Sequence, residues 1–361
     1  MKQLGISVYP GRAGQEETKA YISLASSYGF TRIFTCLISS GDSIDKIKSD
    51  FGEIVSHTRK LGMDVIADVS PSVFEALGIS FRELEFFHEL GLSGLRLDLG
   101  FGGLEESIMT FNPYGLKIEI NMSNGTRYLD NILSHKPNTE NLIGCHNFYP
   151  HRYTGLSRQH FEKCSRLFKQ NGIRTAAFIS SKEAGFGPWP VSEGLCTLEE
   201  HRYLPVEVQA KDLFNTGLVD DVIIANAFAS EAELKALGSI DKELLTLNVE
   251  LVEDIPDVER RIVLEELHFN RGDVSEYMIR STQSRVKYGS HRFELFNAPP
   301  ISRGDILIDS SLYERYAGEL QLALKDMDNS GRTNVVGRIS EKEIYLLDRI
   351  EPWQKFRLKL E

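Results

Sequence analysis

The segment G-L-R-L-D-L-G-F-G-G, residues 94–103, carries the pattern that decides the predicted fold. Every second position from Leu95 to Leu99 is leucine, a spacing typical of a half-buried β-strand. The opposite face of this strand holds Arg96 and Asp98, and a glycine-rich turn follows at once. Charged residues on an inward face, next to such a turn, indicate a strand whose polar end serves a site.

Strand-like runs of this kind recur at intervals of roughly 30 residues, and amphipathic segments follow them. The runs are residues 4–9, 32–37, 64–68, 94–98, 117–121, 142–149, 174–180 and 221–226. Helical patterns cover residues 16–28, 43–61, 81–90, 157–171 and 230–237. Eight such alternations predict a parallel (β/α)₈ TIM barrel. A doubly wound sheet is the weaker alternative, because no G-x-G-x-x-G motif follows the first run.

The pattern changes after Gly238, where short strand candidates replace the β/α alternation. These candidates are residues 243–252, 261–269, 276–282, 305–310, 319–325, 335–339 and 343–347. Turn signals such as N-R-G-D and D-N-S-G separate them. We therefore expect a TIM-barrel domain at residues 1–238 and a small, closed all-β barrel at residues 239–361.

Composition excludes several classes of function. The 361 residues carry a formal net charge of −11, which argues against nucleic acid as a partner. No run approaches the ~20 apolar residues of a membrane span, and no leader is evident, so we expect a cytoplasmic protein without a membrane partner. The four cysteines lie far apart and form no C-x-x-C pair, which indicates free thiols and no metal site. No cofactor is expected.

Acidic residues stand near the carboxyl ends of the third, fourth and fifth predicted strands, where barrel enzymes place their chemistry. We expect Asp68, Asp98 and Glu119 to crowd one mouth and to form the catalytic set. Neighbouring carboxyls in unlike surroundings can serve as acid and base, as in glycosidases. The alternative is structural, because Arg96 can neutralise Asp98 or Glu119 as an ion pair inside the barrel.

Further polar and aromatic residues at strand ends and in the loops form the predicted binding set. Those at or just after the strands are Tyr9, Arg12, Arg96, Asn121, His146, Asn147, Tyr149, Arg152 and Asn226. Glu183, Trp189, His201 and Arg202 lie in a long insertion at residues 180–202 that has the composition of a lid or rim. His146 and His151 as metal ligands are a minor alternative, and Ser157 is expected to cap a helix. Asp220 and Asp221 precede the eighth strand and are excluded.

Five segments resemble the bacterial 6-phospho-N-acetylmuramidase family over the whole chain. They are G-I-S-V-Y-P, L-R-L-D-L-G-F-G-G, I-E-I-N-M-S-N, H-N-F-Y-P and G-P-W-P. The resemblance implies a TIM barrel followed by a cyclophilin-like β-barrel. It also implies cytoplasmic hydrolysis of the β-1,4 bond between N-acetylmuramic acid 6-phosphate and N-acetylglucosamine, in cell-wall recycling. Such a doubly anionic substrate needs local cations, for which the candidates are Arg12, Arg152, Arg202, Arg280 and Arg285.

The mechanism and two other functions stay open at this point. In the hydrolase, Asp98 or Glu119 protonates the leaving oxygen, and the other acid or Asp68 stabilises the sugar cation or activates water; assistance by the substrate acetamido group is a variant. A phosphosugar lyase or isomerase would need a metal or a Schiff-base lysine, for which Lys117 is the candidate. A non-catalytic sugar-phosphate sensor would not need the carboxyls. The expected partner is a small phosphorylated disaccharide, with a homo-oligomer as an open alternative.

Overall fold

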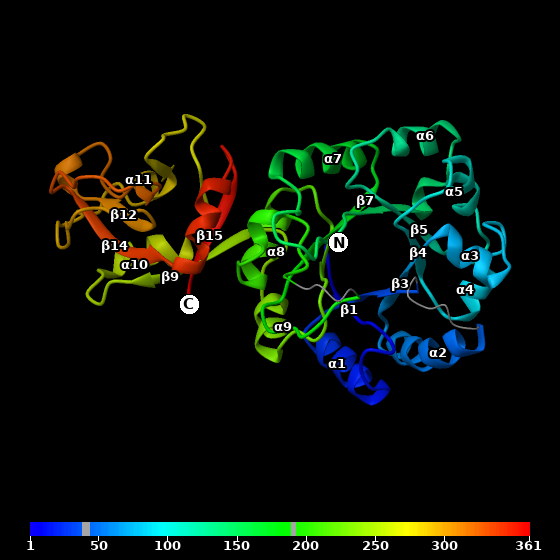
Figure 1. Ribbon diagram of the computed structural model, residues 1–361. Coiled ribbons are helices and arrows are strands. Elements are labelled where there is room, and N and C mark those ends of the chain that lie inside the picture. The colour runs from blue at the N-terminus through cyan, green and yellow to red at the C-terminus, as the bar shows by residue number, and fades with distance from the viewer. Residues whose placement is uncertain (38–43, 189–192) are drawn as a thin grey trace. The chain divides into compact units, whose positions relative to one another are not determined.

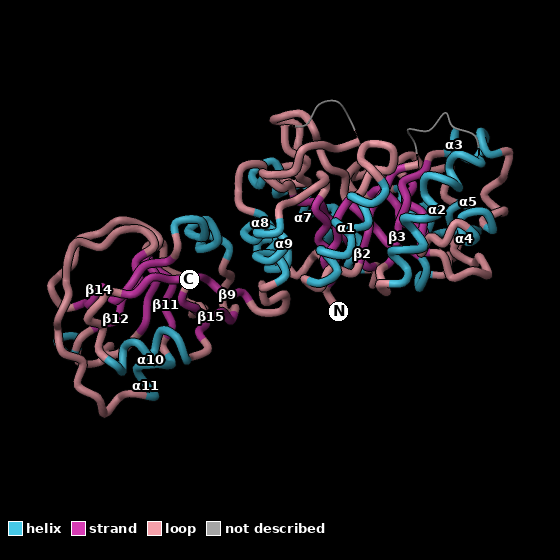
Figure 2. The backbone as a smooth tube through the Cα atoms, turned by 90° about the horizontal axis from the view of Figure 1, so that it is seen from below, coloured by secondary structure: helices cyan, strands magenta, loops and turns pink. Residues whose placement is uncertain are grey.

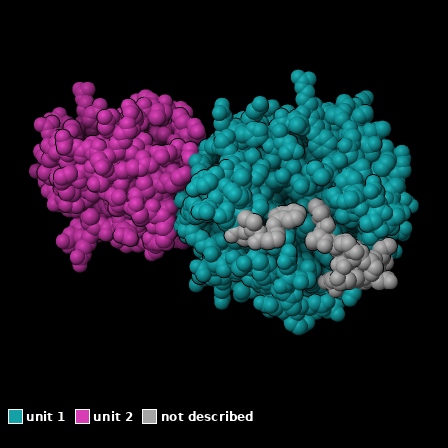
Figure 3. Space-filling model, viewed as in Figure 1, with its two compact units in different colours: residues 1–240 teal, residues 241–361 magenta. Residues whose placement is uncertain are grey.

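The computed structural model describes residues 1–37, 44–188 and 193–361. The chain divides into two compact units, residues 1–240 and 241–361 (Figure 3). The division falls two residues beyond the boundary expected after residue 238. Each unit has its own sheet, and each is described by itself below.

Unit 1 is a closed barrel of eight parallel strands in chain order, surrounded by helices (Figure 1), so the predicted TIM barrel is confirmed. The strands are β1 (Gln3–Ser7), β2 (Arg32–Cys36), β3 (Asp64–Val69), β4 (Gly94–Leu97), β5 (Lys117–Asn121), β6 (Leu142–Cys145), β7 (Arg174–Ile179) and β8 (Asp221–Ile224). The helices are α1 (Gln15–Ser27), α2 (Ile44–Lys60), α3 (Pro71–Leu77), α4 (Glu85–Glu89), α5 (Leu104–Met109), α6 (Tyr128–Ser134), α7 (Arg158–Gln170), α8 (Val206–Asn215) and α9 (Glu231–Gly238). Short 3₁₀ turns are η1 (Thr139–Asn141) and η2 (Glu199–His201).

Period-two alternation separates the two faces of each barrel strand. In β5, Ile118 and Ile120 are fully buried in the main hydrophobic core, while Glu119 belongs to the other face. The strand register pairs Arg96 with Asp68 on one side and with Glu119 on the other. Polar residues of adjacent strands are therefore brought together within the barrel.

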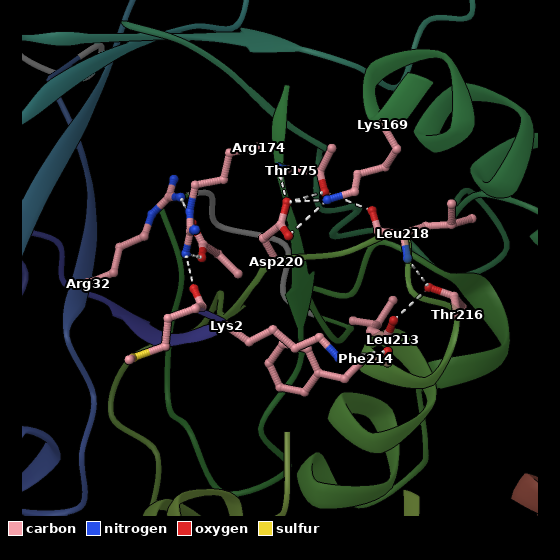
Figure 4. A network of polar contacts seen from close by, with 12 residues as sticks. Lys2, Arg32, Lys169, Arg174, Thr175, Leu213, Phe214, Thr216, Leu218 and Asp220 are labelled. Carbon is pink, nitrogen blue, oxygen red and sulfur yellow. Dashed lines mark hydrogen bonds and ion pairs between the residues drawn. The ribbon is translucent and has the colours of Figure 1, made fainter. Parts of the chain in front are cut away.

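The loops that follow the strands lie on one side of unit 1, and the N terminus lies on the opposite side (Figure 2). At that opposite end, Asp220 accepts hydrogen bonds from Lys169 Nζ and from the Thr175 amide, each at 2.9 Å (Figure 4). Asp221 pairs with Arg32 at 2.7 Å and with Arg174. Both carboxylates therefore stabilise the start of β8, as their exclusion from the candidate site predicts.

Unit 2 is built on a mostly antiparallel sheet with the order β10-β15-β9-β14-β12-β13-β11, in which β15 and β9 are parallel. The strands are β9 (Leu245–Leu251), β10 (His268–Phe269), β11 (Met278–Ser281), β12 (Asp305–Asp309), β13 (Leu320–Ala323), β14 (Thr333–Ile339) and β15 (Lys355–Leu360). The helical segments are α10 (Asp257–Glu265), α11 (Gln283–Lys287), η3 (Ser311–Tyr313) and η4 (Glu341–Arg349). The sheet is barrel-like: the Arg271 amide, just after edge strand β10, donates to the Arg280 carbonyl of edge strand β11 at 3.1 Å.

Two expected strands of unit 2 are helical, and one strand was missed. Residues 261–269 were expected as a strand, but most of them belong to α10, which buries Ile262 and Val263 on one face. Residues 343–347 form part of η4, where Glu343 is turned inward and accepts from the Asn248 amide at 2.7 Å. The missed strand is β15, although K-F-R-L-K-L alternates perfectly.

Helix ends in unit 1 follow the expected local chemistry. Ser157 caps α7 by accepting from the His160 amide, which confirms its predicted role. The predicted helix at residues 81–90 is reduced to the short α4.

In the described part of the chain, no helix is both long and apolar enough to cross a membrane.

Candidate active site

Arg96 lies at the centre of the polar cluster at the carboxyl ends of β3 to β6. One guanidinium nitrogen, Nη1, donates to Asp68 Oδ1 at 2.8 Å. The other, Nη2, donates to Asp98 Oδ1 at 3.4 Å and to the side-chain oxygen of Asn147. Arg96 is 3% exposed, so the strand register holds this cation in place rather than leaving it to solvent. One arginine thus joins two of the three predicted catalytic acids.

The two carboxyls on Arg96 have unlike surroundings. The Asp68 side chain is 12% exposed, whereas that of Asp98 is 37% exposed. Burial raises the pKa of Asp68 to about 6, although the Arg96 charge opposes this shift. Asp98 accepts a second hydrogen bond, from Asn121 Nδ2 at 3.2 Å. The pair therefore offers one carboxyl that can hold a proton near neutral pH and one more accessible carboxylate.

The glycine-rich turn after β4 wraps around the buried carboxylate of Glu106. Glu106 accepts from the Gly103 amide at 2.6 Å, from the Phe101 amide and from the Tyr128 hydroxyl. Gly103 has φ of +103°, a conformation that side chains disfavour. The turn that ends the opening motif is therefore a rigid support for the Asp98 end of the strand.

Glu119 is more deeply buried than the other two predicted acids. Its side chain has no exposed surface and forms an ion pair with Arg32, which also pairs with Asp221. The structure therefore joins Asp68 and Asp98 through Arg96. Of the two ion pairs that the structural alternative names, Arg96–Asp98 is present at 3.4 Å, whereas the ion pair given for Glu119 is with Arg32. Lys117, the Schiff-base candidate, begins β5 and donates to Glu140 O at 2.9 Å.

The H-N-F-Y-P segment contributes two residues to the cluster. Asn147 contacts Arg96, as described above, and Tyr149, two positions further along the chain, is half-buried. Burial raises the pKa of Tyr149, and a contact with Ser123 opposes the shift. His146 has no exposed surface, and both of its ring nitrogens make hydrogen bonds with serines inside the unit. His146 therefore lies in the interior of unit 1 and not at its surface.

The five candidate arginines differ in their partners. Arg152 pairs with Glu193 at 2.9 Å and Arg202 pairs with Glu199 at 2.6 Å. Arg280 and Arg285, in unit 2, both pair with the fully buried Glu319, at 2.7 and 3.2 Å. Arg12 donates to the Pro188 carbonyl at 3.2 Å, and the described residues offer it no carboxylate. Arg12 is therefore the arginine best placed to receive an external anion.

Three of the remaining predicted residues of unit 1 are buried and make contacts within the unit. Tyr9 is buried and donates to Ala225 O, and Asn226 exchanges two hydrogen bonds of 2.8 Å with the Ser181 backbone. His201 is buried against Asp212 at 2.6 Å, and Glu183 is exposed. Trp189 lies outside the described residues.

Arg202 fixes the insertion to the loop after β6. Its guanidinium donates to Tyr149 O at 2.9 Å and to Gly194 O at 3.0 Å. Its partner Glu199 accepts from the Tyr153 and Gly155 amides. The hydrogen bond from Arg202 and these two amides lower the pKa of Glu199 to about 2. Glu199 and Arg202 thus form a clamp between two loops of the site.

Sequence reasoning missed Ser123 and Glu106. Ser123 bonds to Asn121, Asn147 and His146, and its signal is a polar residue two positions after the strand-end Asn121. The signal for Glu106 is an acid three residues after a glycine, the spacing of a capping box. Within residues 1–37, 44–188 and 193–361, no cluster of three or more His, Cys, Asp or Glu residues suits a metal ion.

Comparisons with known proteins agree with this architecture. Residues 4–239 match the family model described as 6-phospho-N-acetylmuramidase, N-terminal, and residues 245–359 match its C-terminal counterpart. An uncharacterized B. cereus protein of known structure is 50% identical over 99% of both chains, with a TM-score of 0.91. A conserved Enterococcus faecalis protein with an unknown function is 27% identical over 99% of this chain and 96% of its own, with a TM-score of 0.71. No curated protein matches. Both units are thus covered by one family, and the chain belongs to the 6-phospho-N-acetylmuramidase family.

Proposed function

We propose that this chain is a glycoside hydrolase that cleaves the β-1,4 bond between N-acetylmuramic acid 6-phosphate and N-acetylglucosamine. The observation that carries the proposal is the Asp68–Arg96–Asp98 cluster at the carboxyl ends of the barrel strands. Family membership supports the same chemistry. We place the reaction in the cytoplasm, in the recycling of cell-wall material, as the sequence resemblance implies.

The two carboxyls have different roles in the proposed reaction because their surroundings differ. Asp68, whose pKa burial raises to about 6, is the general acid that protonates the leaving glycosidic oxygen. Asp98 is the carboxylate that stabilises the oxocarbenium-like centre or activates the attacking water; in the variant with substrate assistance, it orients the acetamido group. Arg96 holds both carboxyls in position. Neither role needs a cofactor.

Arg12 binds one of the two anionic groups of the substrate. It lies in the loop after β1 and contacts Pro188, in the insertion after β7, so it joins two of the loops that follow barrel strands. A guanidinium can bind phosphate or carboxylate through two parallel hydrogen bonds. Because the chain carries a net charge of −11, a local cation is needed to offset repulsion of an anionic substrate.

The direct test compares the purified protein with its Asp68→Asn and Asp98→Asn variants on the phosphorylated disaccharide and on its unphosphorylated twin. Mass spectrometry of the products measures cleavage. We expect the wild type to cleave the phosphorylated compound, and each variant to lose about 100-fold or more in kcat, because proton transfer and charge stabilisation are removed.

Asp64→Asn is the matched control, because Asp64 is an exposed aspartate at the other end of the same strand β3. This variant is expected to keep wild-type activity. Glu119→Gln tests the deeper acid: we expect lower stability and a kcat near that of the wild type. Wild-type activity in Asp68→Asn and Asp98→Asn would contradict the proposal, as would tight binding of the substrate without cleavage, which favours a sensor.

A further inference from the structure

A chain of directed hydrogen bonds runs behind the candidate site through the buried His146. The Ser165 hydroxyl donates its only proton to Phe161 O at 2.8 Å, so its oxygen must accept from His146 Nε2, 2.9 Å away. Burial lowers the pKa of His146 to about 3, so the ring is neutral and Nδ1 carries no proton. Nδ1 therefore accepts from the Ser123 hydroxyl at 3.1 Å.

Hydrogen bonds at its hydroxyl, amide and carbonyl groups hold Ser123 in position. Its hydroxyl group donates to His146 Nδ1 and accepts from the Asn147 backbone amide at 2.8 Å. Its own amide donates to Asn121 Oδ1 at 2.8 Å, and its carbonyl accepts from His160 Nε2 at 2.7 Å. Ser123 is 3% exposed, so water does not compete for these groups.

Asn121 and Asn147 connect Ser123 to Asp98 and to Arg96. Because an amide N–H can only donate, it fixes Oδ1 of Asn121 toward Ser123 and directs Nδ2 toward Asp98, at 3.2 Å. The side-chain oxygen of Asn147 accepts from Arg96, which in turn holds Asp68 at 2.8 Å. The Ser123 backbone amide thus orients Asn121, which contacts Asp98, whereas the Ser123 hydroxyl holds the backbone of Asn147, whose side chain contacts Arg96.

We propose that His146 and Ser123 are positioning residues for the hydrolytic site: the Nε2–H tautomer of His146 orients the Ser123 hydroxyl, and this hydroxyl fixes the backbone of Asn147, whose side chain accepts from Arg96. The Ser123 backbone amide orients Asn121 separately. This inference rests on the proposed function for its kinetic consequences. His146 itself touches no substrate, because it has no exposed surface.

The kinetic experiment compares Ser123→Ala with the matched variant Ser281→Ala. Ser281 in unit 2 also bonds to a buried histidine, His268 Nδ1, at 3.2 Å, and burial likewise lowers the pKa of that histidine, to about 4. We expect Ser123→Ala to lower kcat about 10- to 100-fold with KM little changed, because small misplacements of reacting groups are costly. Ser281→Ala is expected to keep the wild-type kcat. Wild-type kcat in folded Ser123→Ala would overturn the proposal.

A second measurement needs no substrate and therefore separates this inference from the proposed function. Long-range ¹H–¹⁵N spectra of histidine-labelled protein report the tautomer of each ring. We expect His146 to be protonated at Nε2, and the side-chain amide signals of Asn147 to shift in Ser123→Ala but not in Ser281→Ala. Protonation at Nδ1, or unchanged amide signals, would overturn the positioning role even if the wild type cleaves the disaccharide. Absence of cleavage with the expected spectra would overturn the proposed function alone.

Discussion

Asp68 and Asp98 share one guanidinium, yet their exposure differs threefold, at 12% and 37% of the side chain. Removal from water destabilises a charged carboxylate, while a nearby cation stabilises it. For Asp68 the first effect is the larger one, and the pKa rises to about 6. A site that needs one proton donor and one carboxylate can therefore be built from two identical side chains.

The raised pKa of Asp68 predicts a pH dependence of activity. Asp68 is protonated, and competent as an acid, below about pH 6, so kcat/KM should fall as the pH rises through this value. The phosphate of the substrate titrates near the same pH, so kinetics alone are ambiguous. Carboxyl ¹³C spectra of aspartate-labelled protein should show a signal with a midpoint of about 6 that Asp68→Asn removes. A midpoint near 4 would contradict the assignment.

The same shift fixes the sign of a stability effect. The pKa of Asp68 in the folded protein lies above its ordinary value of 3.8, so the folded state binds the proton more tightly than the unfolded state. The contribution of Asp68 to the free energy of unfolding should therefore decline as the pH rises from about 4 to about 6. Asp68→Asn should abolish this part of the pH dependence in denaturant titrations.

Arg12 carries the prediction on substrate recognition. Arg12→Ala should raise KM for the phosphorylated disaccharide about 10-fold or more and leave kcat nearly unchanged, because the anionic group lies away from the bond that breaks. Arg152→Ala is the matched control, since Arg152 is an exposed arginine already paired with Glu193. An unchanged KM in Arg12→Ala would assign the anion to another cation.

The sequence predicts which residues share a face of a strand better than it predicts how deeply each of them is buried. Alternation correctly placed Arg96 and Asp98 together, because side chains two apart share a face. The same rule placed Glu119 with them, but it does not report how far along the barrel axis a residue lies. The register sets Glu119 beside Arg96 rather than Asp98, where Arg32 from β2 pairs with it. That partner is 87 residues away in the chain.

At the scale of elements, the turn after β4 has a shape that its glycines make possible. A Cβ on Gly100 would lie 1.7 Å from the Tyr128 hydroxyl oxygen and 2.7 Å from Glu106 Oε1. Gly100→Ala should therefore lower the free energy of unfolding by about 1–3 kcal/mol and displace Asp98, with lower activity. Urea titration and the cleavage assay measure the two effects.

Gly102→Ala is the control for this turn. Its Cβ would meet the Glu105 side chain at 3.0 Å, at the far end of a flexible group that can move aside. We expect near wild-type stability and activity. Equal stability of Gly100→Ala and Gly102→Ala would show that the packing of Tyr128 on the turn can adapt.

The strands of unit 1 were predicted better than those of unit 2. All eight barrel strands were predicted, because each is a short buried run followed by an amphipathic segment. In unit 2, residues 261–269 are predicted as a strand, but residues 261–265 belong to α10. This helix begins after Pro256 at the N-cap, and its buried residues Glu259, Ile262 and Val263 have the i, i+3, i+4 spacing of one helical face. Local propensity alone does not separate these outcomes for short apolar runs.

At the scale of the whole molecule, the proposed chemistry lies within one unit. Asp68, Arg96 and Asp98 belong to β3, β4 and the turn that follows, and their supports Asn121 and Asn147 belong to the next two strands and their loops. Unit 1 is a closed barrel that contains two hydrophobic core clusters of its own, and residues 1–240 form one compact unit. These features describe a domain that can fold without the rest of the chain.

We therefore expect residues 1–240, expressed alone, to fold and to cleave the phosphorylated disaccharide with a kcat within about tenfold of that of the full chain. Circular dichroism, thermal unfolding and the cleavage assay test this prediction, and the Asp98→Asn form of the same fragment is the control for contaminating hydrolases. A folded fragment without activity would contradict the assignment of the catalytic groups to unit 1 alone, because it would show that residues 241–361 supply a group on which the reaction depends.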